Sequence, residues 1–240
     1  MLINNKSMIT ITENNSTLKN KKGCYMGDSY SVPEVYQNYL RNEFGVLEGY
    51  AGVLNTIGSK KLYGNGWSVR AIVDKIIGCT LDDTADFVVI MAGTNDAHYA
   101  ITNINEGGYK EVGTINDDIS DYKNTSSKTF CMDLKKLFEL TLKKYSGKPI
   151  VYVMQPVRKD SLASQGINER LEIQNNLAKQ ICNMYSIKYI DLFHEYSSGI
   201  ILTDGIHPDT NSYKKIGRLI GKQLDSMMIE ETNLLYIINY

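Results

Sequence analysis

The chain has 240 residues and a formal net charge of −1, with 26 basic and 27 acidic side chains mixed along its length. This length suits one sizeable α/β domain, and the near-neutral charge argues against a nucleic-acid partner. No apolar run approaches the length of a bilayer-spanning helix, so no membrane span is expected. The four cysteines are far apart and form no C-x-x-C pair, which predicts reduced, mostly buried thiols. They are Cys24, Cys79, Cys131 and Cys182.

Residues 1–22 are rich in Asn, Lys and Thr and lack the continuous apolar core of a secretory signal. A cytoplasmic location is therefore the default expectation, and export as part of a larger or phage-borne assembly remains an alternative. The segment is interpreted as a polar arm or as an extra edge strand near residues 8–11. A folded domain is expected over 23–228 and a separate C-terminal tail over 229–240. The sequence leaves the oligomeric state open.

Strand-like and helix-like stretches alternate from residue 23 onward. Short apolar runs predict strands at residues 23–26, 61–63, 87–92, 150–154 and 189–192. Amphipathic spacing predicts helices near residues 31–44, 69–77, 130–141, 173–184 and 216–227. This repeated βα pattern predicts an α/β fold, with a parallel sheet of about five strands covered by helices on both faces.

Three local predictions accompany this pattern. Ser31 is expected to cap the first helix, with Pro33 in its first turn. Residues 97–127 show no clear period and are expected to form a long polar loop. The inner side of the helix near 173–184 is expected to carry Ile173, Leu177, Ile181 and Met184.

Gly27-Asp28-Ser29 follows the first predicted strand and precedes the first predicted helix. A sharp turn between a strand and a helix exposes a side chain at the carboxyl end of the strand, beside backbone N–H groups that bind negative charge. Ser29 is therefore a candidate nucleophile. An ordinary turn that happens to contain a serine is the competing interpretation.

Two further motifs fall at the same edge of the predicted sheet, where ligands of such folds bind. Gly93-Thr94-Asn95-Asp96 follows the third strand, and its Asn amide can donate a hydrogen bond to an oxyanion. Asp204 and His207 are separated by three positions, so a turn can bring the carboxylate against the imidazole and fix its tautomer. His98 and His194 are assigned capping or solvent-facing roles. The three histidines are too scattered to indicate a zinc site, so no metal is expected.

Together with a Gly-x-Gly turn after the second strand, these motifs resemble the GDSL/SGNH hydrolases over about residues 23–224. The resemblance implies a flavodoxin-like three-layer α/β/α fold and serine-dependent ester hydrolysis without a cofactor. It implies that Ser29 is the nucleophile, His207 the general base and Asp204 its orienting carboxylate. The oxyanion hole would consist of the Ser29 and Gly66 backbone N–H groups and the Asn95 side-chain amide.

The chain departs from the family pattern at two places. The second block reads Tyr63-Gly64-Asn65-Gly66-Trp67-Ser68, which leaves Gly64 as a weaker alternative to Gly66. Tyr30 follows the nucleophile where a small or β-branched residue is more common, and its ring is expected to narrow the pocket. By the same resemblance, Asp28 and Asp96 are structural turn residues.

The leading functional hypothesis is an esterase that removes small acyl groups, with acetyl on a carbohydrate as the first candidate. Its partner would be a small-molecule or glycan ester. A lipase, thioesterase or lysophospholipase is the second hypothesis, and a non-catalytic binding module of a surface or phage-tail protein is the third. The residues proposed to contact substrate are Tyr30, Trp67, Tyr99 and Tyr109.

Overall fold

The computed structural model describes residues 16–47, 62–78, 84–102 and 111–238, the last eight as helix backbone. Its centre is a five-stranded parallel sheet with the strand order β2-β1-β3-β4-β5. The strands are β1 (Gly23–Gly27), β2 (Leu62–Tyr63), β3 (Phe87–Met91), β4 (Ile150–Met154) and β5 (Lys188–Asp191). This order is the flavodoxin-like one, in which the direction of winding reverses between β1 and β3, and folds of this kind bind ligands at the carboxyl ends of the strands at such a point. The predicted fold class is confirmed.

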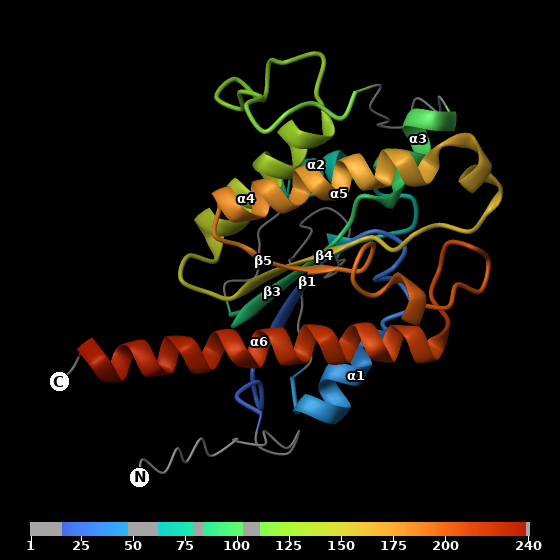
Figure 1. The fold of residues 1–240 in the computed structure, drawn as a ribbon. Coiled ribbons are helices and arrows are strands. Elements are labelled where there is room, and N and C mark those ends of the chain that lie inside the picture. The colour runs from blue at the N-terminus through green and yellow to red at the C-terminus, as the bar shows by residue number, and fades with distance from the viewer. Residues whose placement is uncertain (1–15, 48–61, 79–83, 103–110, 239–240) are drawn as a thin grey trace, which may run out of the picture.

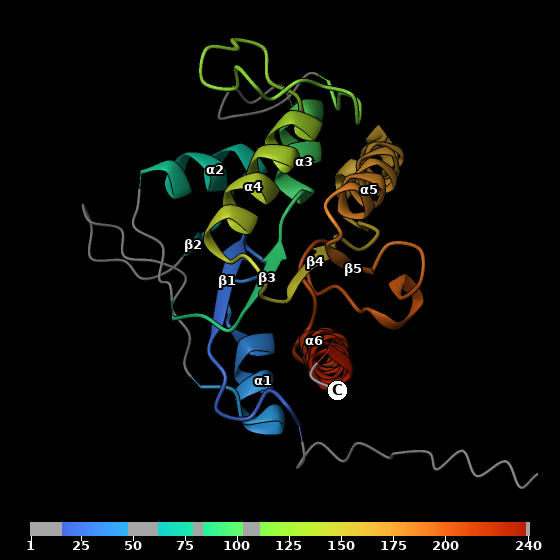
Figure 2. The same cartoon turned by 90° about the vertical axis from the view of Figure 1, so that its left-hand side faces the viewer.

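Helices cover both faces of the sheet, which gives three layers (Figures 1 and 2). One face carries α2 (Val69–Ile77), α4 (Phe130–Lys144) and α5 (Ile167–Met184), and the other carries α1 (Val35–Phe44) and α6 (Thr210–Ile238). The remaining helix α3 (Thr94–Thr102) directly follows β3, and two short 3-10 turns occupy Ser161–Gln165 and Ser197–Gly199. None of the helices in the described ranges is long and apolar enough to cross a membrane.

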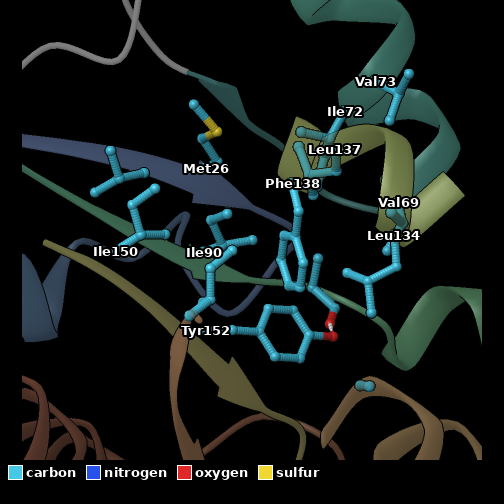
Figure 3. Packing of buried hydrophobic residues seen from close by; sticks show 14 of the residues in the cluster. Met26, Val69, Ile72, Val73, Ile90, Leu134, Leu137, Phe138, Ile150 and Tyr152 are labelled. Atoms are coloured by element: carbon cyan, nitrogen blue, oxygen red, sulfur yellow. Dashed lines mark hydrogen bonds between the residues drawn. The ribbon is translucent and has the colours of Figure 1, made fainter. Parts of the chain in front are cut away.

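The strands divide their side chains between two cores because successive residues of a strand point to opposite faces. Met26, Ile90 and Tyr152 belong to the cluster under α2, α4 and α5, whereas their neighbours Tyr25 and Val89 pack toward α1 and α6. Figure 3 shows Phe138 and Tyr152 meeting within the first cluster, where their rings are edge-to-face with centroids 5.6 Å apart. Burial on both faces explains why the central strands read as continuous apolar runs.

The start of the first helix differs from the prediction. Residues 29–33 form turns, and α1 begins only at Val35, after Glu34 in a left-handed conformation with φ 56°. Ser31 is not the cap, because its hydroxyl is buried and shares a hydrogen bond of 3.0 Å with the Tyr36 hydroxyl. The prediction that Ser31 caps α1 is therefore wrong, because this serine is buried against Tyr36.

The inner side of α5 was also predicted partly wrongly. Ile173 and Met184 are 53% and 55% exposed, whereas Gln174 and Asn175 are buried. Asn175 donates its side-chain amide to the Gln155 carbonyl, 3.2 Å away, just past the end of β4. The buried face of α5 therefore runs through Ile167, Leu171, Ala178, Ile181 and Cys182 and includes two polar side chains.

Residues 97–127 are not one continuous loop. Helix α3 takes the segment to Thr102, residues 103–110 lie outside the described ranges, and residues 111–129 are irregular. Within that last part, Tyr122 is buried and its hydroxyl donates to Asp133 of α4. The part of the segment around Tyr122 is therefore packed against α4.

Both chain ends of the described structure involve α6. The predicted tail is continuous with this helix as far as Ile238. Near the other end, Ser16 and Thr17 donate to the buried carboxylate of Asp225 on α6, at 2.8 Å and 2.6 Å from their hydroxyl groups. The end of the predicted polar arm is thus attached to the last helix, and the edge strand proposed near residues 8–11 lies outside the described residues.

Helix α5 offers a matched test of this packing. Ile181 is fully buried, while Ile173 on the same helix is 53% exposed. Ile181→Ala should lower the free energy of unfolding by about 2–5 kcal/mol, the usual loss for a buried isoleucine. Ile173→Ala should change it by about 0.5 kcal/mol or less. Urea unfolding followed by circular dichroism measures both, and equal losses would contradict the described orientation of α5.

Candidate active site

The turn after β1 that carries Ser29, here called the nucleophile turn, is held against the sheet by hydrogen bonds. Beyond β1 the Asp28 N–H donates to the Met91 carbonyl at 3.1 Å, and the Tyr30 N–H donates to the Asp28 carboxylate at 3.0 Å. Gly27 is required here, because a Cβ at this position would lie 2.4 Å from the Met91 carbonyl oxygen. The chain therefore leaves the sheet sharply and places Ser29, half-buried, at the carboxyl end of β1.

The loop before α6 brings together Asp204, the predicted orienting carboxylate, and His207, the predicted base. Asp204 accepts the backbone N–H groups of Ile206 and His207 on one carboxylate oxygen, at 2.9 Å and 2.7 Å. Its other oxygen lies 2.7 Å from His207 Nδ1. His207 Nε2 lies 2.9 Å from Ser29 Oγ. Side chains that are 178 positions apart in the sequence thus form one continuous hydrogen-bonded chain.

This geometry sets the charge state of the Asp204 carboxyl. Partial burial tends to raise its pKa, but the side-chain and backbone hydrogen bonds from His207 prevail and lower the pKa to about 2. Asp204 is therefore a carboxylate at any physiological pH. A carboxylate on Nδ1 keeps the proton of neutral His207 on that nitrogen, and Nε2 is left to accept a proton from Ser29.

Helix α3 and the turn after β2 place the proposed oxyanion donors. The Asn95 amide donates to the Trp67 carbonyl at 3.1 Å, which ties its helix to this turn. Gly66 adopts φ 73°, and its carbonyl accepts the Tyr99 hydroxyl at 2.6 Å. The Gly64 N–H donates to the Gly27 carbonyl, whereas the N–H groups of Gly66 and Ser29 have no acceptor within the described ranges. This difference favours Gly66 over Gly64 as an oxyanion donor.

The two aspartates of the motifs are buried away from the reacting groups. Asp96 accepts the Val69 N–H with both carboxylate oxygens at 3.1 Å and so fixes the first residue of α2. Burial raises the pKa of Asp28 to about 8, the hydrogen bond from the Tyr30 N–H opposes this rise, and the nearby Asp96 adds to it. Both carboxyl groups are completely inaccessible, which fits the structural role expected for them.

The four residues proposed to contact substrate have different surroundings. Tyr30 is completely buried, so its ring does not line an open pocket and this part of the prediction is corrected. Trp67 is half-buried, and its indole packs against Gly64, where a Cβ would lie 2.5 Å from the ring. Tyr99 is partly exposed, with its hydroxyl on Gly66. Tyr109 lies outside the described residues.

A second Asp–His pair was overlooked in the sequence. Asp191 precedes His194 by three positions, accepts the His194 N–H at 3.0 Å, and lies 2.8 Å from His194 Nδ1. The pair repeats the local geometry of Asp204 and His207, earlier in the same connection between β5 and α6. The spacing alone would have revealed the pair, but only the fold shows which histidine reaches Ser29.

The loop after β4 also contributes to the site, because it contacts the loop that carries His207. No sequence motif predicted this contact. The Lys159 N–H donates to the Gly205 carbonyl at 2.8 Å, and a Cβ on Gly205 would lie 2.5 Å from the backbone nitrogen of Asp160. Arg158 is buried, pairs with the Asp160 carboxylate, and places a guanidinium nitrogen 3.4 Å from His98 Nδ1. Burial and the Arg158 charge both lower the pKa of His98.

Within the described ranges, no group of three or more His, Cys, Asp or Glu side chains could hold a metal ion.

Several solved structures share the fold. A protein from Lactobacillus plantarum superposes with a TM-score of 0.63 at 17% identity, covering 87% of this chain and 98% of its own. A lipase/acylhydrolase from Enterococcus faecalis gives 0.54 at 14% identity, covering 86% and 96%. A catalytic mutant of an acetylxylan esterase from Geobacillus stearothermophilus gives 0.56 at 14% identity, covering 86% and 94%. At these identities the likeness shows the fold alone.

No curated protein sequence matches the chain. The model of the GDSL-like lipase/acylhydrolase family matches residues 25–215. That span includes the nucleophile turn, the Asn95 segment and the Asp204–His207 loop. Because it covers most of the 240 residues, the match shows that the chain belongs to the GDSL-like lipase/acylhydrolase family.

Proposed function

We propose that the protein is a serine esterase that removes short acyl groups, and that acetyl esters of carbohydrates are its natural substrates. The observation that carries the reaction is the continuous chain from Ser29 Oγ to His207 Nε2, at 2.9 Å, and from His207 Nδ1 to Asp204, at 2.7 Å. This arrangement supplies a nucleophile, a base within hydrogen-bond reach and a group that orients the base.

In the acylation step, His207 Nε2 accepts the Ser29 proton as Oγ bonds to the carbonyl carbon of the ester. The carbonyl π electrons move to oxygen, and this oxyanion is stabilised by the N–H groups of Ser29 and Gly66 and by the Asn95 amide. When the intermediate collapses, the C–O bond to the alcohol breaks and His207 donates its proton to the departing oxygen. Water then attacks the acyl-Ser29 ester by the same steps, releasing the acid and restoring the serine.

The preference for a short acyl group rests on the polar character of the neighbouring segments. His98, Arg158 and Asp160 lie together on α3 and the loop after β4, and the aromatic side chains of Trp67 and Tyr99 accompany the oxyanion turn. Such groups suit a hydrated, hydroxyl-rich ligand better than a long hydrocarbon. The acetylxylan esterase among the similar folds accords with this proposal.

Two other functions are less well supported. A lipase, thioesterase or lysophospholipase would use the same catalytic groups on another ester. A non-catalytic binding module would not need hydrogen bonds from Asp204 through His207 to Ser29 at 2.7 Å and 2.9 Å. The complete chain of contacts therefore favours turnover.

The first prediction concerns the catalytic pair. Ser29→Ala and His207→Ala should each remove most hydrolysis of p-nitrophenyl acetate, because the two groups act as a unit. A fluorophosphonate probe should label the wild type at Ser29 and leave Ser29→Ala unlabelled. Asp204 should stay ionised throughout the assay, because the hydrogen bonds from His207 lower its pKa to about 2.

His194→Ala is the matched control, because it removes the same residue from the same kind of Asp–His turn. It should keep nearly all of the activity. Full activity in Ser29→Ala, or equal losses in the two histidine variants, would contradict the assignment.

The second prediction concerns the oxyanion. Asn95→Ala should lower kcat by about 10²–10³ with little change in KM, the usual effect of removing one oxyanion donor. Steady-state kinetics with p-nitrophenyl acetate measures both constants. An increase in KM at constant kcat would instead make Asn95 a residue that binds the ground-state substrate.

The third prediction concerns the acyl group. Along a series of p-nitrophenyl esters, kcat/KM should fall steeply when the acyl chain is longer than about four carbons. Burial of each added CH₂ against apolar side chains would contribute about 0.8 kcal/mol to binding, and a polar site does not provide that burial. Acetylated xylo-oligosaccharides should be deacetylated, with release of acetate measured by an enzyme-coupled assay. Faster cleavage of long-chain esters would favour the lipolytic alternative.

A further inference from the structure

We propose that Tyr30 is a positioning residue that sets the distance between the nucleophile and the catalytic base; this inference rests on the proposed esterase function. Tyr30 is the residue immediately after Ser29, and its completely buried side chain does not line an open pocket. Its role in this chain is therefore to be sought in its own contacts.

The Tyr30 side chain reaches the loop that carries the base. Its hydroxyl donates to the carbonyl of Ile206, the residue before His207, at 2.5 Å, and joins positions that are 176 residues apart. Its ring lies 5.7 Å from the imidazole of His207, tilted by 47°. The side chain is completely inaccessible to solvent. A partly buried hydrogen bond thus holds the backbone next to His207, and a ring contact holds the His207 side chain.

The other end of Tyr30 is equally fixed. Its N–H donates to the Asp28 carboxylate at 3.0 Å, and the Asp28 N–H donates to the Met91 carbonyl of β3 at 3.1 Å. The residue therefore bridges the edge of the sheet and the loop of His207. Because a buried tyrosine has only two side-chain torsions between these anchors, it holds them at a nearly constant separation.

The remaining anchors of this loop come from elsewhere. The Gly205 carbonyl accepts the Lys159 N–H at 2.8 Å. The His207 carbonyl accepts the Thr203 N–H and hydroxyl, at 2.8 Å and 3.1 Å. Of these three successive carbonyl groups, only that of Ile206 is held by the segment that carries Ser29. Tyr30 is therefore the contact that places the base relative to the nucleophile, whereas Lys159 ties the loop to the segment after β4 and Thr203 closes the loop on itself.

Such a residue should affect the reaction more than substrate binding. Proton transfer from Ser29 to His207 requires a short, aligned contact, and a small displacement of one partner slows it strongly. Removing the hydroxyl frees the Ile206 carbonyl while leaving the groups of the oxyanion hole in place. The expected signature is a lower kcat with an unchanged KM.

Tyr30→Phe tests this directly, because it deletes the hydroxyl and keeps the ring. With p-nitrophenyl acetate, kcat should fall about tenfold with KM unchanged, which corresponds to the loss of one buried hydrogen bond at the reacting pair. The rate at which a fluorophosphonate probe labels Ser29 should fall by the same factor. Tyr30→4-aminophenylalanine retains a donor at the para position and should recover most of the lost kcat.

Tyr36→Phe is the matched control, since Tyr36 is also fully buried and its hydroxyl hydrogen-bonds to Ser31 rather than to the catalytic loop. It should leave kcat within about twofold of the wild type. The proposal is overturned if Tyr30→Phe matches Tyr36→Phe in kcat, if the amino variant gives no recovery, or if Tyr30→Phe fails to fold where Tyr36→Phe folds. Absence of esterase activity in the wild type would instead refute the proposed function itself.

Discussion

The pairing of β1 with β3 is the constraint on which the site depends. The two strands run in register from Gly23 beside Phe87 to Gly27 beside Met91, and the ladder continues for one further bond, from the Asp28 N–H to the Met91 carbonyl. This close approach leaves no room for a side chain on Gly27. The strand order reverses between these two strands, so Ser29 and Asn95 follow the carboxyl ends of adjacent strands at the point where ligands of such folds bind.

Most of the fold could be predicted from the sequence because the central strands are buried on both faces and therefore consist of continuous apolar runs. The five strands, their parallel direction and the α/β class follow from this pattern. Helix detail was less predictable where polar groups are used inside the protein. Ser31 is buried against Tyr36 instead of capping α1, and the burial of Gln174 and Asn175 leaves Ile173 exposed on α5. A rule that places polar residues outside cannot anticipate such contacts.

For the site, the sequence carried the motifs but not the contacts between them. Spacing placed Asp204 against His207 within one turn, because a local hydrogen bond requires only local geometry. The same spacing occurs in Asp191 and His194, and only the path of the loop between β5 and α6 decides which histidine reaches Ser29. The role of Tyr30 was misjudged for a related reason. Its hydroxyl finds a carbonyl 176 positions away, a partner that no short motif can encode.

The distance along the chain between Ser29 and His207, 178 positions, also has a kinetic meaning. Helical contacts are local and paired strands close shorter loops, whereas this contact joins the end of the first strand to the loop before the last helix. Contacts of such long sequence separation carry the largest loop-closure entropy and tend to form late. A refolding chain can therefore regain much of its helical signal while its serine is still inert. The Ser29–His207 contact is therefore expected to form when the loop before α6 docks on the sheet, after the core has collapsed.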